Sequence, residues 1–286
     1  MRILVLLLLL LLPCASYADL LTGGEIVYSI RRGDCLLLIG ARFGVDWQVI
    51  ARENGLDPKK PCRVGKQLII NNRKIVPKAI SDGIIVNIPD KMLYFFKEGK
   101  LATSFPVGLG MPSKRWQTPT GSFVILYKEK NPTWHVPTSI QKEMEKKDEP
   151  VEEVVPPGPD NPLGRYALHT SLPGVLIHET IWPTTVYQFR SHSCIRVLPA
   201  DMEGEFFDEV RASTPGETIY EPVNVAVSDD GRIFLQVDRD SYHRIVSLEE
   251  EVKAHIEERS LSDKVDWTKV ESAVGKRSGI AEDVTR

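Results

Sequence analysis

The fold of the central part of this chain is decided by residues 83–105, which read GIIVNIPDKMLYFFKEGKLATSF. The stretch contains three short runs rich in β-branched and aromatic residues, separated by Pro89-Asp90 and by the turn-forming residues 97–100. A further such run at 122–127 follows the sequence Thr-Pro-Thr-Gly at 118–121. Several short strands at this spacing predict a β-sandwich or barrel rather than a βαβ fold. We assign this mainly-β domain to residues 83–220.

The segment before it, residues 26–72, has the pattern of a small βααβ unit. Residues 26–30 and 64–70 have strand composition, and the apolar stretches between them predict two short helices. Gly44 and Gly55 are placed to end these helices, and Asp46 is placed to cap the second one.

After Tyr220 the sequence predicts a hairpin, because residues 223–227 and 233–237 are apolar runs around Asp229-Asp230-Gly231. The remainder to Arg286 looks helical and polar, as expected of a tail that packs on the rest of the chain or faces a partner. Residues 221–286 are therefore expected to form a C-terminal hairpin and helical tail. The fold class of the whole chain is α+β.

Residues 1–18 have the features of a signal peptide: a positive start, an apolar run of ten residues, Pro13, and small residues up to Ala18. A ten-residue helix is about 15 Å long, half of the roughly 30 Å that a membrane span requires. We expect cleavage after Ala18, with a lipoprotein signal on Cys14 as the alternative. An exported mature chain without a membrane span is expected.

Composition excludes two classes of protein. The chain is 42% hydrophobic and 26% charged, with a net charge of −3. It lacks both the basic excess of nucleic-acid-binding proteins and the polarity of disordered chains.

Export changes the interpretation of the cysteines, because exported proteins meet oxidising conditions. Cys35 and Cys62 lie in one small segment, and a disulfide closing that loop would stabilise it by roughly 3–4 kcal/mol. The alternative is that both are small apolar fillers. Cys194 is then the odd thiol, and a free thiol at risk of oxidation suggests a chemical role.

Cys194 lies in the sequence Arg-Ser-His-Ser-Cys-Ile-Arg at 190–196, and His169, His178 and His192 precede it closely. A thiol with a pKa near 8.5 needs a base or a positive field to react near neutral pH, and His178 or His192 could supply it. We expect His169 and His135 to be structural. Zinc coordination by His178, His192 and Cys194 is an alternative, but no CxxC or HExxH motif accompanies them.

These residues carry a family resemblance. His178, followed 16 residues later by Cys194 within Ser191-His192-x-Cys194-Ile195-Arg196, is similar to the signature of the L,D-transpeptidase (YkuD-type) family. Residues 118–121 and 161–165 also resemble stretches of that family. The resemblance implies that Cys194 is the nucleophile and His178 the general base, oriented by the main-chain carbonyl of Glu179. Ser191, Ser193 and His192 would shape the site, and Arg196 would hold the loop or meet a substrate carboxylate.

The implied reaction is acyl transfer on peptidoglycan in the periplasm of a Gram-negative bacterium. The thiol would attack the third residue of a tetrapeptide stem and expel D-alanine, with no metal or organic cofactor. The acceptor would be another stem, giving a 3–3 cross-link, or a lysine of an outer-membrane lipoprotein. Hydrolysis of the same thioester and a glycan-binding scaffold with a degenerate catalytic domain are the alternatives.

Two positions depart from the family pattern, which has glycine where this chain has Glu179 and Ser193. If position 193 requires a positive φ, serine there costs about 1–2 kcal/mol. The carboxylate of Glu179 is expected to raise the pKa of His178.

The 26–72 segment resembles the LysM module through Tyr28, Gly33-Asp34, Asn54-Gly55-Leu56 and the stretch at 64–68. The resemblance implies binding of glycans that contain N-acetylglucosamine, and the alternative is a small domain without a ligand. A further segment, residues 143–162, is charged and then proline-rich. It is either a solvated surface loop or a lid over a cleft.

Overall fold

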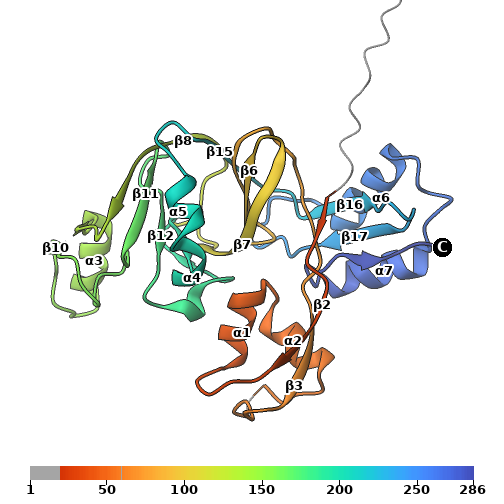
Figure 1. Ribbon diagram of the computed structural model, residues 1–286, viewed down its shortest axis with the longest axis horizontal. Helices are drawn as coiled ribbons and strands as arrows, with labels where there is room; N and C mark the ends of the chain where they lie inside the picture. The colour runs from red at the N-terminus through yellow and green to blue at the C-terminus, as the bar shows by residue number, and fades with distance from the viewer. Residues whose placement is uncertain (1–19, 59) are drawn as a thin grey trace, which may run out of the picture.

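The computed structural model describes residues 20–58 and 60–286, so the predicted signal peptide lies outside the described residues. Three groups of elements are visible in Figure 1: a helical unit near the N-terminus, a central barrel and a C-terminal unit of strands and helices. Nowhere in the described ranges is there a helix long and apolar enough to cross a membrane.

The N-terminal unit has the predicted βααβ order. Its elements are β2 (Glu25–Ser29), α1 (Leu36–Phe43), α2 (Trp47–Glu53) and β3 (Gln67–Asn71), and the two strands pair antiparallel. Gly44, with φ of 67°, ends α1 in the left-handed conformation, where glycine is not strained. The Asp46 carboxylate caps α2 by accepting a hydrogen bond from the Gln48 N–H at 2.8 Å.

The central unit is a barrel, which is one of the two architectures, sandwich or barrel, that the sequence predicts. Its sheet has the order β13-β7-β14-β12-β11-β8-β15-β5-β6, and β6 also pairs with β7, which closes the barrel. Buried apolar side chains of these strands fill the interior. The strands are β5 (Gly83–Asn87), β6 (Met92–Lys97), β7 (Lys100–Gly110), β8 (Gly121–Lys130), β11 (Tyr166–Thr170), β12 (Leu176–Glu179), β13 (Phe189–Ser191), β14 (Ile195–Val197) and β15 (Pro215–Ile219).

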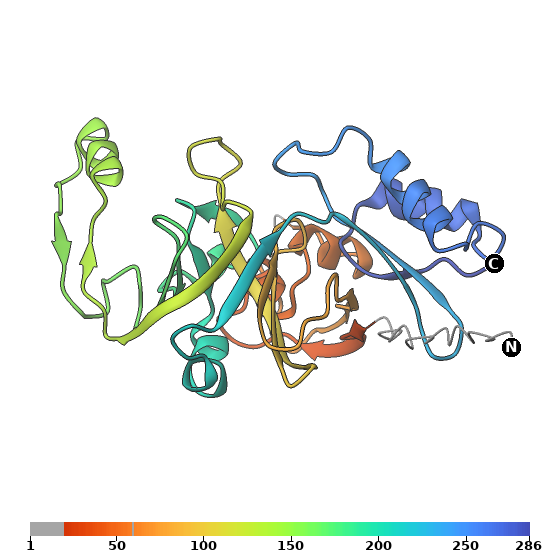
Figure 2. The ribbon, with the colours of Figure 1, turned by 90° about the horizontal axis from the view of Figure 1, so that it is seen from above.

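Between β8 and β11 the chain leaves the barrel. This excursion contains β9 (Trp134–His135), α3 (Thr138–Lys146) and β10 (Val154–Val155), with β9 and β10 paired antiparallel. Figure 2 shows it extending beyond the barrel, at the left of the view. Helix α3 buries none of its residues. Short helices η1 (Pro183–Thr185), α4 (Pro199–Met202) and α5 (Glu205–Glu209) connect the later strands.

The C-terminal unit contains the predicted hairpin, β16 (Val223–Val227) and β17 (Ile233–Val237), followed by α6 (Leu248–Glu258), α7 (Trp267–Lys276) and β18 (Glu282–Asp283). The expectation of a polar helical tail was incomplete. Both helices bury an apolar face, including Val252, Ile256 and Val270, against the hairpin, and β18 returns to pair with β17. These residues form a core of their own.

The three units meet at the strands that flank the N-terminal unit, β1 (Leu21–Thr22) and β4 (Lys74–Ile75), which pair with each other. The buried Lys74 ammonium donates to the Tyr187 hydroxyl of the central unit at 2.8 Å and to the Gly279 carbonyl of the C-terminal unit. Lys74 therefore connects all three units.

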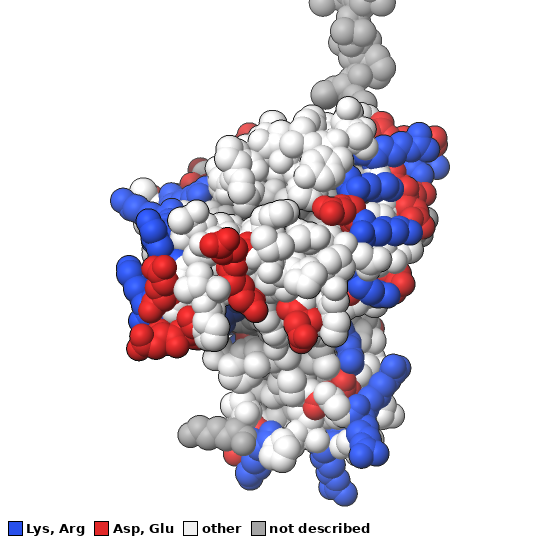
Figure 3. Space-filling view, turned by 90° about the vertical axis from the view of Figure 1, so that its left-hand side faces the viewer, with Lys and Arg blue, Asp and Glu red and all other residues white. Residues whose placement is uncertain are grey.

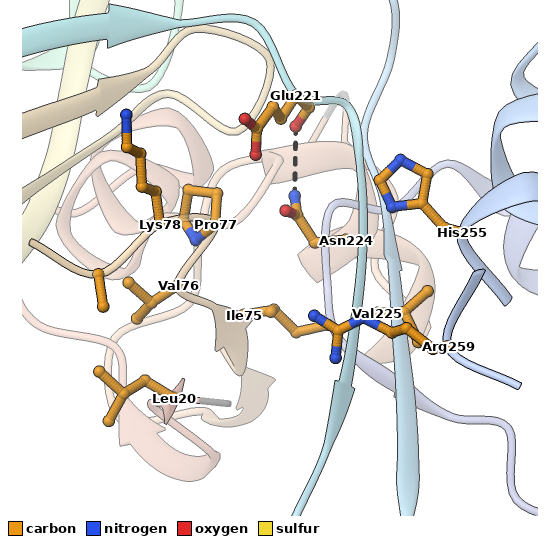
Figure 4. A pocket seen from close by; sticks show the side chains of 11 residues that line it. Leu20, Ile75, Val76, Pro77, Lys78, Glu221, Asn224, Val225, His255 and Arg259 are labelled. Carbon is orange, nitrogen blue, oxygen red and sulfur yellow. Dashed lines mark hydrogen bonds between the residues drawn. The ribbon is translucent and has the colours of Figure 1, made fainter. Parts of the chain in front are cut away.

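A pocket of about 160 Å³ lies between the chain that follows β4 and the C-terminal unit, with Lys78 and His255 on its walls (Figure 4).

Candidate active site

The site is built on two neighbouring strands, β12 and β14, which run parallel with His178 opposite Arg196 and Ile177 opposite Ile195. Ile177 and Ile195 are fully buried in the barrel core. Because successive side chains of a strand point to opposite faces, His178 and Arg196 project from the other face. Cys194 precedes β14 by one residue and continues this alternation, so Cys194 and His178 share that face.

The imidazole of His178 is fixed by the chain that follows it. Nδ1 lies 2.6 Å from the main-chain carbonyl oxygen of Glu179. Since a carbonyl only accepts hydrogen bonds, Nδ1 carries the proton and Nε2 is left as the basic nitrogen of the neutral ring. This is the contact that the family resemblance implies.

Burial lowers the pKa of His178 to about 4, and the positive charge of Arg196 acts in the same direction. The carbonyls of Glu179 and Leu163 oppose this shift. The ring is therefore neutral near pH 7 and able to accept a proton.

The expectation that Glu179 would raise the pKa of His178 was wrong. The Glu179 carboxylate accepts a hydrogen bond from the Arg165 main-chain N–H at 3.2 Å and lies 3.3 Å from the Arg165 guanidinium. It packs on Gly164, where an added Cβ would lie 2.7 Å from the Glu179 Cβ. Its charge is thus compensated by Arg165.

The thiol of Cys194 is protonated at rest. Burial raises its pKa, against the opposing effects of the Leu176 main chain and the Arg196 charge. The sulfur lies 3.7 Å from the Gly174 carbonyl oxygen, which is the hydrogen-bond partner that the structure gives it. A protonated thiol must give up its proton during attack, and catalytic hydrogen bonds often tighten only when substrate binds.

The loop that carries Cys194, residues 191–194, is held by hydrogen bonds on both sides. The buried Ser191 hydroxyl donates to the Cys194 carbonyl, and the Met111 N–H donates to the Ser191 carbonyl at 2.9 Å. Ser193 has a φ of 81°, in the left-handed region. The predicted positive φ at this position is confirmed, and serine pays about 1–2 kcal/mol for it.

Arg196 lies two residues after Cys194 and opposite His178 on the neighbouring strand. Its guanidinium stands over the Trp182 ring at 5.4 Å, and its buried Nε–H has no hydrogen-bond partner among the described residues. A buried cation with an unused donor fits a carboxylate of a bound substrate.

His192 connects the loop to the excursion. Its Nε2 lies 3.0 Å from a carboxylate oxygen of Glu143 on α3, and its ring meets Trp116 edge-on at 4.5 Å. The excursion therefore contacts the loop that carries Cys194, which favours the predicted lid over the simple surface loop. His169 stacks on Tyr127 instead, and Trp134 lies in β9, opposite Val155 of β10.

The predicted Cys35–Cys62 disulfide is not formed in the structure, where both residues and Cys194 are free thiols. Burial and the nearby Cys35 raise the pKa of the Cys62 thiol. The two thiols are thus close enough to interact, and their pairing stays a prediction.

Sequence reasoning missed three residues around the site: Arg165, Thr118 and Tyr242. Arg165 and Thr118 lie in the two stretches, 161–165 and 118–121, that carried the family resemblance. Those stretches were the available signal for both residues. Tyr242 lies in the C-terminal unit, and nothing in its sequence surroundings pointed to the site.

Comparisons with known proteins agree with this geometry. Residues 81–225 match the family model of the L,D-transpeptidase catalytic domain (YkuD), and residues 28–71 match that of the LysM domain. The chain is 30% identical to "Probable L,D-transpeptidase YcfS" of Escherichia coli over 72% of this chain and 65% of the relative. It is 26% identical to "Probable L,D-transpeptidase ErfK/SrfK" of Salmonella typhimurium over 94% and 89%. It is 30% identical to "Probable L,D-transpeptidase YbiS" of Escherichia coli over 79% and 74%. The chain therefore belongs to the L,D-transpeptidase (YkuD) family and carries a LysM domain at residues 28–71.

Proposed function

We propose that this protein is an exported, periplasmic L,D-transpeptidase that acts on peptidoglycan tetrapeptide stems through a thioester on Cys194. The observation that carries the proposal is the placement of Cys194 and His178 on one face of β12 and β14, with Nδ1 of His178 held by the Glu179 carbonyl. With Nδ1 held in this way, Nε2 of His178 is the base that we assign to the thiol.

In the first half-reaction the Cys194 thiol passes its proton to Nε2 of His178 as sulfur bonds to the carbonyl carbon of the third stem residue. The C–N bond to D-alanine then breaks, and the imidazolium returns the proton to the leaving amine. In the second half-reaction an acceptor amine attacks the thioester carbon, the C–S bond breaks, and the thiol regains a proton. Arg196 is placed to bind a carboxylate of the donor stem.

The LysM domain would hold the enzyme on its substrate. Its tip, formed by the loops on either side of the two helices, exposes Arg31, Arg32, Arg63 and Lys66 and lies at the bottom of Figure 3. This position leaves the tip free for a glycan strand. The acceptor is a second stem, giving a 3–3 cross-link, or a lysine of an outer-membrane lipoprotein; release to water would make the enzyme a hydrolase.

A glycan-binding scaffold is the second candidate, and the thiol that faces Gly174 with Ser193 strained beside it favours that candidate. Incubation with a disaccharide tetrapeptide separates the two. The enzyme releases D-alanine and loses this activity with Cys194→Ala, whereas a scaffold sediments with peptidoglycan and releases none.

A further inference from the structure

Four hydrogen bonds join the C-terminal unit to the peptide that precedes the nucleophile. The Tyr242 hydroxyl donates to the Gly110 carbonyl at 2.7 Å and accepts from the Thr118 N–H at 3.1 Å. The Thr118 hydroxyl accepts from the Gly110 N–H at 3.0 Å and donates to the Ser193 carbonyl at 3.0 Å. Each hydroxyl uses its single proton and accepts one bond, so the two side chains together connect residue 242 with residue 193.

This network is buried and closely packed. Thr118 is fully buried and Tyr242 is 5% exposed. Gly110 accommodates the loop because an added Cβ would lie 2.6 Å from the Thr118 nitrogen. Burial raises the pKa of Tyr242, so its hydroxyl keeps the proton that it donates.

Tyr242 is itself fixed from the C-terminal side. Its N–H donates to the Tyr220 hydroxyl at 2.9 Å, and that hydroxyl donates to the Asp240 carboxylate. The Arg244 guanidinium also reaches the loop of Thr118, at 3.2 Å from the Thr120 hydroxyl. The segment after β17 therefore holds the loop from outside the barrel.

The carbonyl that Thr118 holds belongs to the same planar peptide as the N–H of Cys194. In a trans peptide the C=O and the N–H point in opposite directions, so fixing the Ser193 oxygen fixes the direction of the Cys194 N–H. Ser191 holds the following carbonyl, that of Cys194. The N–H of a nucleophilic residue is a natural donor to the oxyanion that forms on the attacked carbonyl.

We propose that Thr118 and Tyr242 are positioning residues that hold the left-handed Ser193 peptide, so that the Cys194 N–H is aimed at the oxyanion of the acyl-transfer intermediates. The C-terminal unit thereby completes the active site of the barrel. This inference rests on the proposed function of Cys194 as the nucleophile.

The test compares two reactions of Cys194 in the mature protein. Acylation by a carbapenem passes through a tetrahedral oxyanion: sulfur bonds to the β-lactam carbonyl, the ring C–N bond breaks, and nitrogen takes up a proton. Alkylation by iodoacetamide displaces iodide and forms no oxyanion. Loss of oxyanion stabilisation therefore slows the first reaction and leaves the second unchanged.

Thr118→Val is expected to slow acylation about 10- to 100-fold, since removal of one oxyanion donor costs about 100- to 1,000-fold and here the donor is displaced, not removed. Thr118→Ser keeps the hydroxyl and should stay within about threefold of the wild type. Tyr242→Phe should slow acylation about 3- to 10-fold, because it acts on Ser193 only through Thr118. Alkylation rates should stay within about twofold in all three.

Thr218→Val is the matched control, because it removes another buried hydroxyl that donates to a carbonyl of the same loop, that of Pro119 at 2.6 Å. Its acylation rate should be that of the wild type. If Thr218→Val slows acylation as much as Thr118→Val does, or if Thr118→Val also slows alkylation, the effect is a general loss of structure and the proposal is wrong. Acylation of Thr118→Val at the wild-type rate would also overturn it. If the wild-type protein itself is not acylated, the proposed function fails instead.

Discussion

Glu179 contacts its neighbour His178 through its main chain and Arg165 through its side chain. The Glu179 carbonyl fixes the imidazole at 2.6 Å, while the Glu179 carboxylate turns to Arg165. The base is thereby oriented without a carboxylate beside its ring. Glu179, at a position where the family has glycine, is tolerated because its carboxylate is paired with Arg165.

The pH dependence of acylation should follow His178. Its pKa of about 4 means that Nε2 remains basic down to that pH, so the carbapenem acylation rate should fall only as the pH approaches 4. The Arg196 charge lowers this pKa, so Arg196→Gln should move the acid limb to higher pH. Acylation rates of both proteins between pH 4 and 8 would check this, with circular dichroism as the control for folding. An acid limb near pH 6.5 in the wild type would contradict the low pKa.

Ser193→Gly should stabilise the protein, because glycine adopts a φ of 81° without the penalty that serine pays. We expect a gain of about 1 kcal/mol in the free energy of unfolding and an acylation rate at least equal to that of the wild type. Urea unfolding measures the first quantity. Ser113→Gly, on the neighbouring surface loop at a residue without a positive φ, is the control and should give no gain. A loss of stability in Ser193→Gly would mean that the serine side chain does more than tolerate its conformation.

The excursion between β8 and β11 should become more mobile when its contact with His192 is removed. Glu143→Gln replaces the carboxylate that lies 3.0 Å from Nε2 of His192, and a half-exposed hydrogen bond of this kind contributes about 0.5–1 kcal/mol. We therefore expect up to about fivefold faster hydrogen exchange over 138–146 and a similar change in acylation by a bulky carbapenem. Glu145→Gln on the same helix is the control. Equal hydrogen exchange in the two variants would show that the contact of Glu143 with His192 does not hold the excursion in place.

The cysteines of the LysM domain should pair in the exported protein. Oxidation of Cys35 and Cys62 by a disulfide such as oxidised glutathione yields one disulfide and two reduced thiols of the oxidant. Thiol labelling of the denatured, non-reduced protein should then tag Cys194 alone. Reduction should lower the free energy of unfolding of the LysM domain by roughly 3–4 kcal/mol. Labelling of all three cysteines after oxidation, or a bridge that includes Cys194, would refute the pairing.

Much of the fold was predictable, because the short apolar runs of β5, β6 and β7 and the glycine-bounded helices of the LysM domain are local patterns. The closure of the barrel was not, since it depends on the pairing of β6 with β7 in addition to the neighbours in the sheet. The roles of Cys194 and His178 were predicted from the family resemblance of the sequence around them, and they stay a prediction. The contact between Thr118 and Tyr242 joins residues 124 positions apart, and no local sequence pattern in either segment predicts it. The direction of the Glu179 side chain likewise depends on Arg165, which lies in the turn just before β11.

The proposed function requires Cys194 to be a nucleophile that becomes acylated, with His178 as its base. The most direct measurement is the intact mass of the mature protein after incubation with a carbapenem, for the wild type, Cys194→Ala and His178→Gln. We expect the wild type to gain the mass of one drug molecule, Cys194→Ala to gain none, and His178→Gln to be modified at least about 100-fold more slowly at pH 7. An unmodified wild type, or an adduct that persists in Cys194→Ala, would refute the thioester on Cys194.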